Sequence, residues 1–135
     1  MLRMTVRAER RALAGGRDAA QILLLPVIGT IAVLAATLER GGDLRVDELC
    51  VSCRALGRRL EDTMLTQALL CAAGDDQPGA VVFRVAEGPR NAPARRWLAA
   101  YVGLDLAATT GKVVVPFDFI RAKRVDDAVE IELAD

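Results

Sequence analysis

The segment Val51–Glu61, VSCRALGRRLE, decides the predicted fold because it stands where a strand pattern gives way to a helix pattern. Gly57 can adopt backbone conformations that let several amides converge, and three arginines beside it add full positive charges. The first amides of a helix lack internal partners, and the helix dipole places partial positive charge at the same end. The junction therefore predicts a phosphate cradle, with an ordinary charged loop as the alternative; its residues would be Arg54, Gly57, Arg58 and Arg59.

Strand and helix periods flank this junction. Residues 44–52 alternate as a strand, but Leu44 and Val46 are in one phase while Leu49 and Val51 are in the other, which predicts an irregularity between the two pairs. Residues 58–73 change to the three- and four-residue steps of a packed helix. Its apolar stripe comprises Leu60, Met64, Leu65, Ala68, Leu69 and Ala72.

The rest of the pattern predicts a second helix and more strands. The helix spans residues 91–103, where Asn91 is a good N-cap, Pro93 suits the first turn and Gly103 can close the end. This order of strands and helices predicts one α/β (α+β) domain with a mixed sheet and helices packed on it. The further strands are expected at residues 19–25, 28–38, 80–88, 112–122 and 128–134.

Two N-terminal stretches allow more than one interpretation. Residues 1–17 are basic and rich in alanine, and predict a short amphipathic helix or a solvated lead-in to a single domain over residues 18–135. Residues 22–38 form a run of seventeen without a charge, slightly short of the roughly 20 that a membrane span needs. Two buried strands that turn near residues 26–29 are favoured, and a small membrane-anchored protein is the remote alternative.

Composition narrows the function classes. The 135-residue chain balances 18 basic against 18 acidic residues, so no overall charge attracts nucleic acid or an anionic membrane. It has no histidine, and Cys50 and Cys53 lack a second ligand pair, so no metal is expected. The third cysteine, Cys71, is expected to be a packing residue of the helix. An odd number of cysteines predicts a reducing, cytoplasmic setting.

The order of elements around the junction resembles the core of the GNAT (GCN5-related N-acetyltransferase) fold. In that family a Q/R-x-x-G-x-G/A loop between a strand and a helix holds the pyrophosphate of coenzyme A. Arg54 and Gly57 match the first and fourth positions, whereas Arg59 stands where the family has a small residue. The resemblance implies a mixed, mostly antiparallel sheet, and places Asn91 near the pantetheine arm at the start of the second helix.

A more specific resemblance extends over residues 28–104. SCRALGRRLE, Ser52–Glu61, is very similar to the S-C-R-V-L-G-R-x-x-E signature in the acyltransferase-like part of FkbH-like proteins, with Ala55 as the difference. Those proteins deliver a glyceryl group as a thioester to an acyl carrier protein in polyketide biosynthesis. This implies Cys53 as the acyl acceptor and coenzyme A or carrier-protein phosphopantetheine as the ligand; a buried cysteine at a strand end is the alternative. Because the sequence has no D-x-D motif, a separate phosphatase-type partner is expected.

The same resemblance disfavours ordinary N-acetylation. Seven residues after Asn91, where many GNAT enzymes carry a tyrosine, this chain has Leu98, and Tyr101 lies on another side of the helix. The predicted function is an acyltransferase-like module that handles an acyl thioester, such as a glyceryl thioester, between itself and an acyl carrier protein or coenzyme A. The alternative is a non-catalytic binding or assembly module that keeps the phosphopantetheine cradle. An acidic carrier protein could dock on Arg90, Arg95 and Arg96, and an exposed sheet edge makes a homodimer plausible.

Overall fold

A mixed sheet of seven strands organises the described part of the chain, with three α-helices and a short 3-10 helix packed around it. The computed structural model describes residues 2–13, 17–26, 32–39, 42–51, 61–86, 88, 92–123 and 129–134. In chain order the elements are β1 (Leu2–Leu13), β2 (Arg17–Pro26), β3 (Ala32–Glu39), β4 (Leu44–Val51), α1 (Glu61–Ala73), β5 (Ala80–Val85), α2 (Ala92–Val102), the 3-10 helix η1 (Leu106–Ala108), β6 (Gly111–Pro116), α3 (Phe117–Arg121) and β7 (Val129–Ala134).

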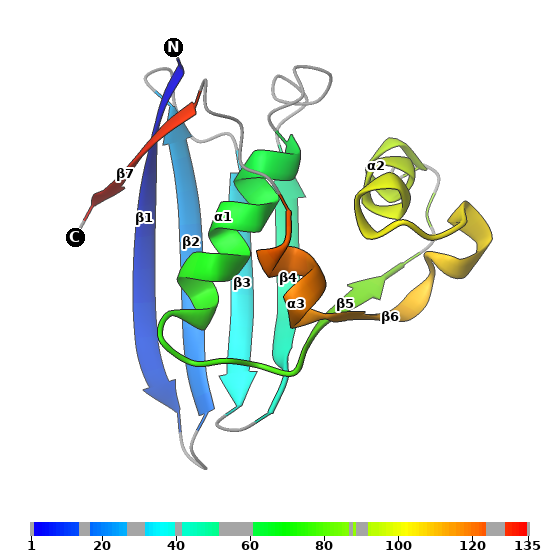
Figure 1. The fold of residues 1–135 in the computed structure, drawn as a ribbon, viewed down its shortest axis with the longest axis horizontal. Helices are drawn as coiled ribbons and strands as arrows, with labels where there is room; N and C mark the ends of the chain where they lie inside the picture. Colours follow the sequence, from blue (N-terminus) through cyan, green and yellow to red (C-terminus); the bar gives the residue numbers. More distant parts are fainter. Residues whose placement is uncertain are drawn as a thin grey trace.

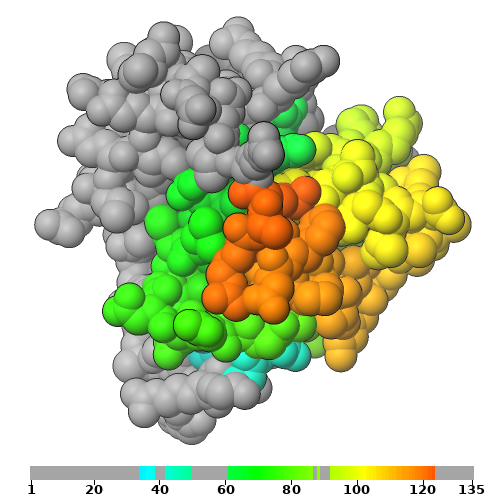
Figure 2. Space-filling view, in the orientation of Figure 1, coloured from blue at the N-terminus to red at the C-terminus, as the bar shows by residue number. Residues whose placement is uncertain are grey.

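The strand order is β6-β5-β4-β3-β2-β1-β7. Neighbouring strands from β1 to β4 pair antiparallel, as do β5 and β6, while β4–β5 and β1–β7 are parallel. Helix α1 lies across one face of the sheet, with α3 beside it (Figures 1 and 2). The expected mixed, mostly antiparallel sheet with helices packed on it is therefore confirmed.

The core forms where α1 covers the sheet. The predicted apolar stripe of this helix is buried from Met64 to Ala72; Leu60 lies outside the described residues. Below it, alternate residues of β4, β5 and β6 point inward, as the period of two in a strand requires. These inward residues are Leu44, Val46, Val81, Phe83, Val113 and Val115.

Glycines end both long helices. Gly74 (φ 60°) follows α1, and its amide donates to the carbonyl of Leu70 at 3.0 Å. Gly103 (φ 74°) follows α2, and the next amide, of Leu104, donates to Ala99 at 3.0 Å. A positive φ is strained for residues with a Cβ, so these are positions where glycine stops a helix. The predicted end of the second helix at Gly103 is confirmed.

For two segments, the predicted type of secondary structure was wrong. A short helix or solvated lead-in was expected over residues 1–17, but Leu2–Leu13 form strand β1, which pairs with β2 on one side and with the distant β7 on the other. The strand expected over residues 112–122 ends at Pro116, and helix α3 follows. Phe117 and Ile120 are buried three residues apart, which is helical rather than strand spacing.

The apolar run at residues 22–38 contributes to two paired strands. Within the described positions, β2 and β3 run antiparallel, with Ile22 opposite Leu34 and Leu24 opposite Ala32. None of the helices in the described ranges is long and apolar enough to cross a membrane. The favoured interpretation of this run as two strands is confirmed.

Leu69 tests the packing of α1 on the sheet. Its side chain has 0% exposure, so Leu69→Ala leaves a cavity and should lower the free energy of unfolding by about 2–5 kcal/mol. Urea denaturation followed by circular dichroism measures this loss. Leu104→Ala is the matched control because Leu104 is 43% exposed, and it should change the free energy by less than about 0.5 kcal/mol. Equal losses in the two variants would contradict the placement of Leu69.

Candidate functional site between β4 and β5

A β-bulge interrupts β4 at Asp47. Ala36 of β3 is opposite Val46, but the next pair joins Ala35 to Glu48, so Asp47 is an extra residue on β4. The bulge explains why Leu44 and Val46 fall in one phase of the sequence and Leu49 in the other. A bulge bends its strand, increases the local twist and can end pairing with a neighbour. The irregularity predicted in this strand is confirmed.

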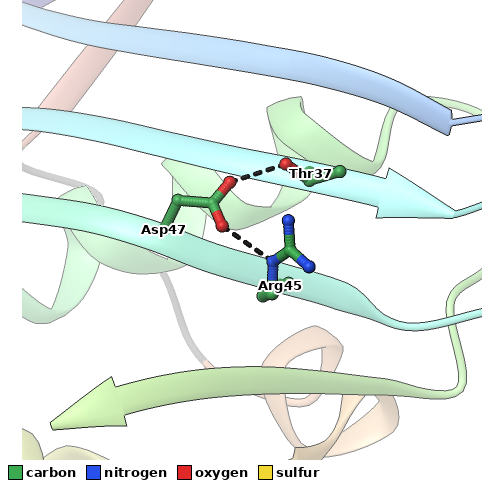
Figure 3. Close-up of polar contacts among 3 residues, drawn as sticks. All are labelled: Thr37, Arg45 and Asp47. Carbon is green, nitrogen blue, oxygen red and sulfur yellow. Dashed lines mark hydrogen bonds and ion pairs between the residues drawn. The ribbon is translucent and has the colours of Figure 1, made fainter. Parts of the chain in front are cut away.

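The side chain of Asp47 is held by two neighbours on the sheet (Figure 3). The Thr37 hydroxyl donates to one carboxylate oxygen at 2.6 Å, and Arg45 Nε donates to the other at 2.7 Å. The ion pair is more than a third exposed on both sides, so we expect about 0–1 kcal/mol of stabilisation from it. Its main effect is to orient Asp47 on the face away from α1, because Thr37 and Arg45 alternate with residues of the core.

Strands β4 and β5 separate where the bulge begins. Their parallel pairing covers Leu44 with Val81, Arg45 with Val82 and Val46 with Phe83, and stops there. Both strands continue, to Val51 and Val85, and Figure 1 shows β5 leaving the direction of β4. The divergence opens the sheet next to the N-terminal half of α2.

A pocket of about 210 Å³ lies in this opening. Its floor is apolar and made by the buried side chains of Val46, Phe83 and Leu98. Charged residues that include Asp47 and Arg84 surround it, so the pocket joins an apolar interior to a polar margin. In full it is lined by residues 46–49 of β4, residues 83–86 of β5 and the following loop, and Ala94, Arg95, Trp97 and Leu98 of α2.

Polar contacts hold α2 as one wall of the pocket. Trp97 Nε1 donates to the carboxylate of Asp62, in the first turn of α1, at 2.8 Å. The guanidinium of Arg95 donates to the carbonyls of Leu106 and Thr109, both at 3.3 Å. Arg95 therefore holds α2 against the segment around η1. Because two of its N–H groups are used there, fewer remain for the predicted carrier-protein surface.

Tyr101 faces α1 rather than the pocket. It is 1% exposed, and its hydroxyl shares a hydrogen bond of 2.7 Å with that of Thr66. Burial raises the pKa of Tyr101 to about 12; the Asp62 charge adds to this effect and the bond to Thr66 partly offsets it. Leu98, not Tyr101, lines the pocket, as the spacing from Asn91 predicts.

The residues predicted to form the site lie outside the described residues. These are the cysteine, the cradle and the helix cap: Cys53, Arg54, Gly57, Arg58, Arg59 and Asn91. Their neighbours in the chain are described, however. β4 ends at Val51 and α1 begins at Glu61, so the cradle sequence connects a wall of the pocket to the start of α1, and α2 begins directly after Asn91. Their roles stay predictions.

The opened sheet and its flanking helices define a GNAT-like fold. The structure is similar to a solved tandem GNAT protein from the clavulanic acid biosynthesis pathway, determined without AcCoA, with a TM-score of 0.51 and 19% sequence identity. The match covers 67% of this chain and 29% of the length of that chain. At this identity the likeness establishes the fold alone. No family model and no curated protein sequence matches the chain.

The sequence did not point to several residues of the pocket. Phe83 and Arg84 belong to a predicted strand, but sequence spacing alone does not show that β5 lies beside β4. The phase change between Val46 and Leu49 was the available signal, because it marks the bulge where the pairing stops.

The raised pKa of Tyr101 predicts a loss of stability in alkali. The unfolded state ionises this group near pH 10 while the folded state holds its proton to about 12, so the free energy of unfolding should fall as pH rises from 10 to 12. Tyr101 is the only tyrosine, so tyrosinate absorbance measures its ionisation directly. Its native midpoint should be near pH 12 and should move to near 10 in denaturant. A native midpoint near 10 would contradict the buried position.

Proposed function

We propose that this chain is an acyltransferase-like module that binds a pantetheine arm in the β4–β5 pocket. The observation that carries the proposal is the divergence of two parallel strands immediately after a bulge. It leaves a pocket with an apolar floor inside an otherwise continuous sheet. A pantetheine arm is extended, carries amide groups that can pair with unpaired strand edges, and ends in a thiol, so a strand-flanked opening suits it. The arm could belong to coenzyme A or to an acyl carrier protein.

The phosphate end of this ligand has a natural position in the proposal. Helix α1 has 13 residues and starts at Glu61, directly after the sequence with Arg54, Gly57 and the paired Arg58 and Arg59. The N-terminus of a helix this long favours a bound anion, because its first amides are free and the helix dipole places partial positive charge there. The pantetheine arm would then extend from this end along β4 into the pocket.

Cys53 is proposed as the covalent residue. In the sequence it follows Val51, the last residue of β4, by two positions, and β4 forms one wall of the pocket. Its thiolate would attack the thioester carbonyl, the carbon–sulfur bond of the donor would break, and the pantetheine thiolate would leave and take up a proton. The reaction exchanges one thioester for another without a change in oxidation state, so it needs no oxidant. The similarity of SCRALGRRLE to the FkbH-like signature supports a glyceryl group as the cargo.

Intact-mass measurement tests the role of Cys53. After incubation with acetyl-CoA or with a glyceryl thioester of pantetheine, the unmodified protein should gain the mass of one acyl group. Cys53→Ala should abolish this gain, while Cys71→Ala, on α1, should retain it because Cys71 packs against the core. Loading of Cys53→Ala at the level of the unmodified protein would exclude it as the nucleophile.

A non-catalytic binding module is the second candidate. It is favoured by one observation: among the described residues no cysteine or tyrosine lines the pocket, and Tyr101 is turned toward Thr66. Such a module would bind the same pantetheine arm and form no adduct with either donor. Binding without any mass gain in the unmodified protein would select this candidate over the acyltransferase.

Trp97 allows ligand binding to be measured separately from catalysis. It is the only tryptophan and lines the pocket, so coenzyme A should change its fluorescence. Ala94→Phe should fill part of the pocket from α2 and weaken binding by about tenfold, equivalent to ~1.4 kcal/mol.

The matched control is Ala100→Phe, which adds the same ring to an exposed position of α2 away from the pocket. It should bind coenzyme A as the unmodified protein does. The pocket assignment is wrong if Ala94→Phe and Ala100→Phe weaken the binding of coenzyme A equally.

A further inference from the structure

Two cations face each other on β5 and β6 without a carboxylate between them. Arg84 and Lys112 are directly opposite in the antiparallel register, and both side chains are exposed. Like charges in this position destabilise a strand pair. Within the described part of the chain, neither side chain forms an ion pair or hydrogen bond. An anion bound between them would turn this repulsion into attraction.

The pair lines a hollow on the face of the sheet away from α1. This hollow has a volume of about 250 Å³ and is lined by Thr37, Asp43, Arg45, Val82, Arg84 and Lys112. The positive charge of Arg45 is matched by Asp47 at 2.7 Å. Asp43 adds one carboxylate to the lining but makes no ion pair with Arg84 or Lys112 among the described residues. Apart from the paired Arg45, the hollow therefore carries two cations and one carboxylate, and its remaining charge is positive.

Arg84 connects the hollow to the β4–β5 pocket, because it lines both. The hollow is on the outer face, with Thr37 and Arg45, whereas α1 and its N-terminus cover the inner face. A ligand whose phosphates bind near the start of α1 would thus approach the opening from one face. A second molecule could reach the same opening from the other face, past Arg84.

We infer that Arg84 and Lys112 bind a carboxylate or phosphate of the second substrate, the molecule that exchanges the acyl group with the pantetheine thioester. A guanidinium can hold either anion through two parallel hydrogen bonds, and the ammonium adds a point charge. The assignment to a second substrate rests on the proposed function, whereas the anion site itself rests on the two cations and the hollow.

Titration of the 135-residue chain with inorganic phosphate and with succinate tests the site. At constant ionic strength, amide shifts in nuclear magnetic resonance spectra should be centred on residues 82–84 and 112–114. Arg84→Gln and Lys112→Gln should each weaken binding by about fivefold, or ~1 kcal/mol. Arg121→Gln is the control, since Arg121 is an exposed arginine of α3 that lines neither cavity. The anion site would be overturned if the Arg84 and Lys112 variants kept the affinity of the unmodified protein for phosphate, or if all three variants lost the same amount.

A second arm identifies the source of the anion. If phosphate binds equally well to protein saturated with coenzyme A, the site is separate from the coenzyme phosphates and the second-substrate role is supported. If coenzyme A displaces phosphate from residues 82–84, the cations hold the coenzyme and that role is overturned. If coenzyme A does not bind but phosphate binding still depends on Arg84 and Lys112, the anion site stands and the proposed function falls.

Discussion

The bulge at Asp47 is the constraint on which the site depends. One extra residue in β4 shifts its register on β3, and pairing with β5 ends at the same level, at Val46 and Phe83. The opening therefore has a local cause in the main chain. It does not require a missing side chain or a mobile loop. The carboxylate of Asp47, bonded to Thr37 and Arg45, holds the extra residue on the outer face, so the bulge is supported by contacts from two strands.

The opening is useful only if its walls keep their positions, and α2 is fixed by three separate contacts. Trp97 bonds to Asp62, Tyr101 bonds to Thr66, and Arg95 bonds to carbonyls next to η1. The first two tie α2 to α1, which itself packs on the sheet. The tilted contact between the Trp97 and Tyr101 rings, 6.1 Å between centroids, links these bonds into one packed unit. Tyr101 thus stabilises the wall behind the pocket, which explains a buried hydroxyl that no ligand in the pocket could use.

Local patterns predicted most elements and missed what depends on distant partners. The helical stripe from Met64 to Ala72 and the glycine after α2 are local signals, and both were interpreted correctly. β1 was missed because its basic, alanine-rich sequence becomes a strand through pairing with β7, at the other end of the chain. The pocket could not be predicted for the same reason. Phe83 and Arg84 lie near Asp47 because β5 pairs in parallel with β4, although α1 separates the two strands in the sequence. The cradle around Gly57 was predicted from one contiguous segment that lies outside the described residues, so it stays a prediction.

The two faces of the opened sheet differ in chemistry, and this difference sets the face from which each ligand would approach in the proposed reaction. The inner face is apolar where α1 covers it, so the proposed phosphate position is at the N-terminus of α1 rather than beneath the helix. The outer face around the opening carries Arg45, Arg84 and Lys112, of which only Arg45 is matched by an aspartate in the described structure. A thioester and an anionic partner would then meet from opposite sides at the point where β4 and β5 separate. Neither ligand would have to pass the other, because each would approach that point from its own face.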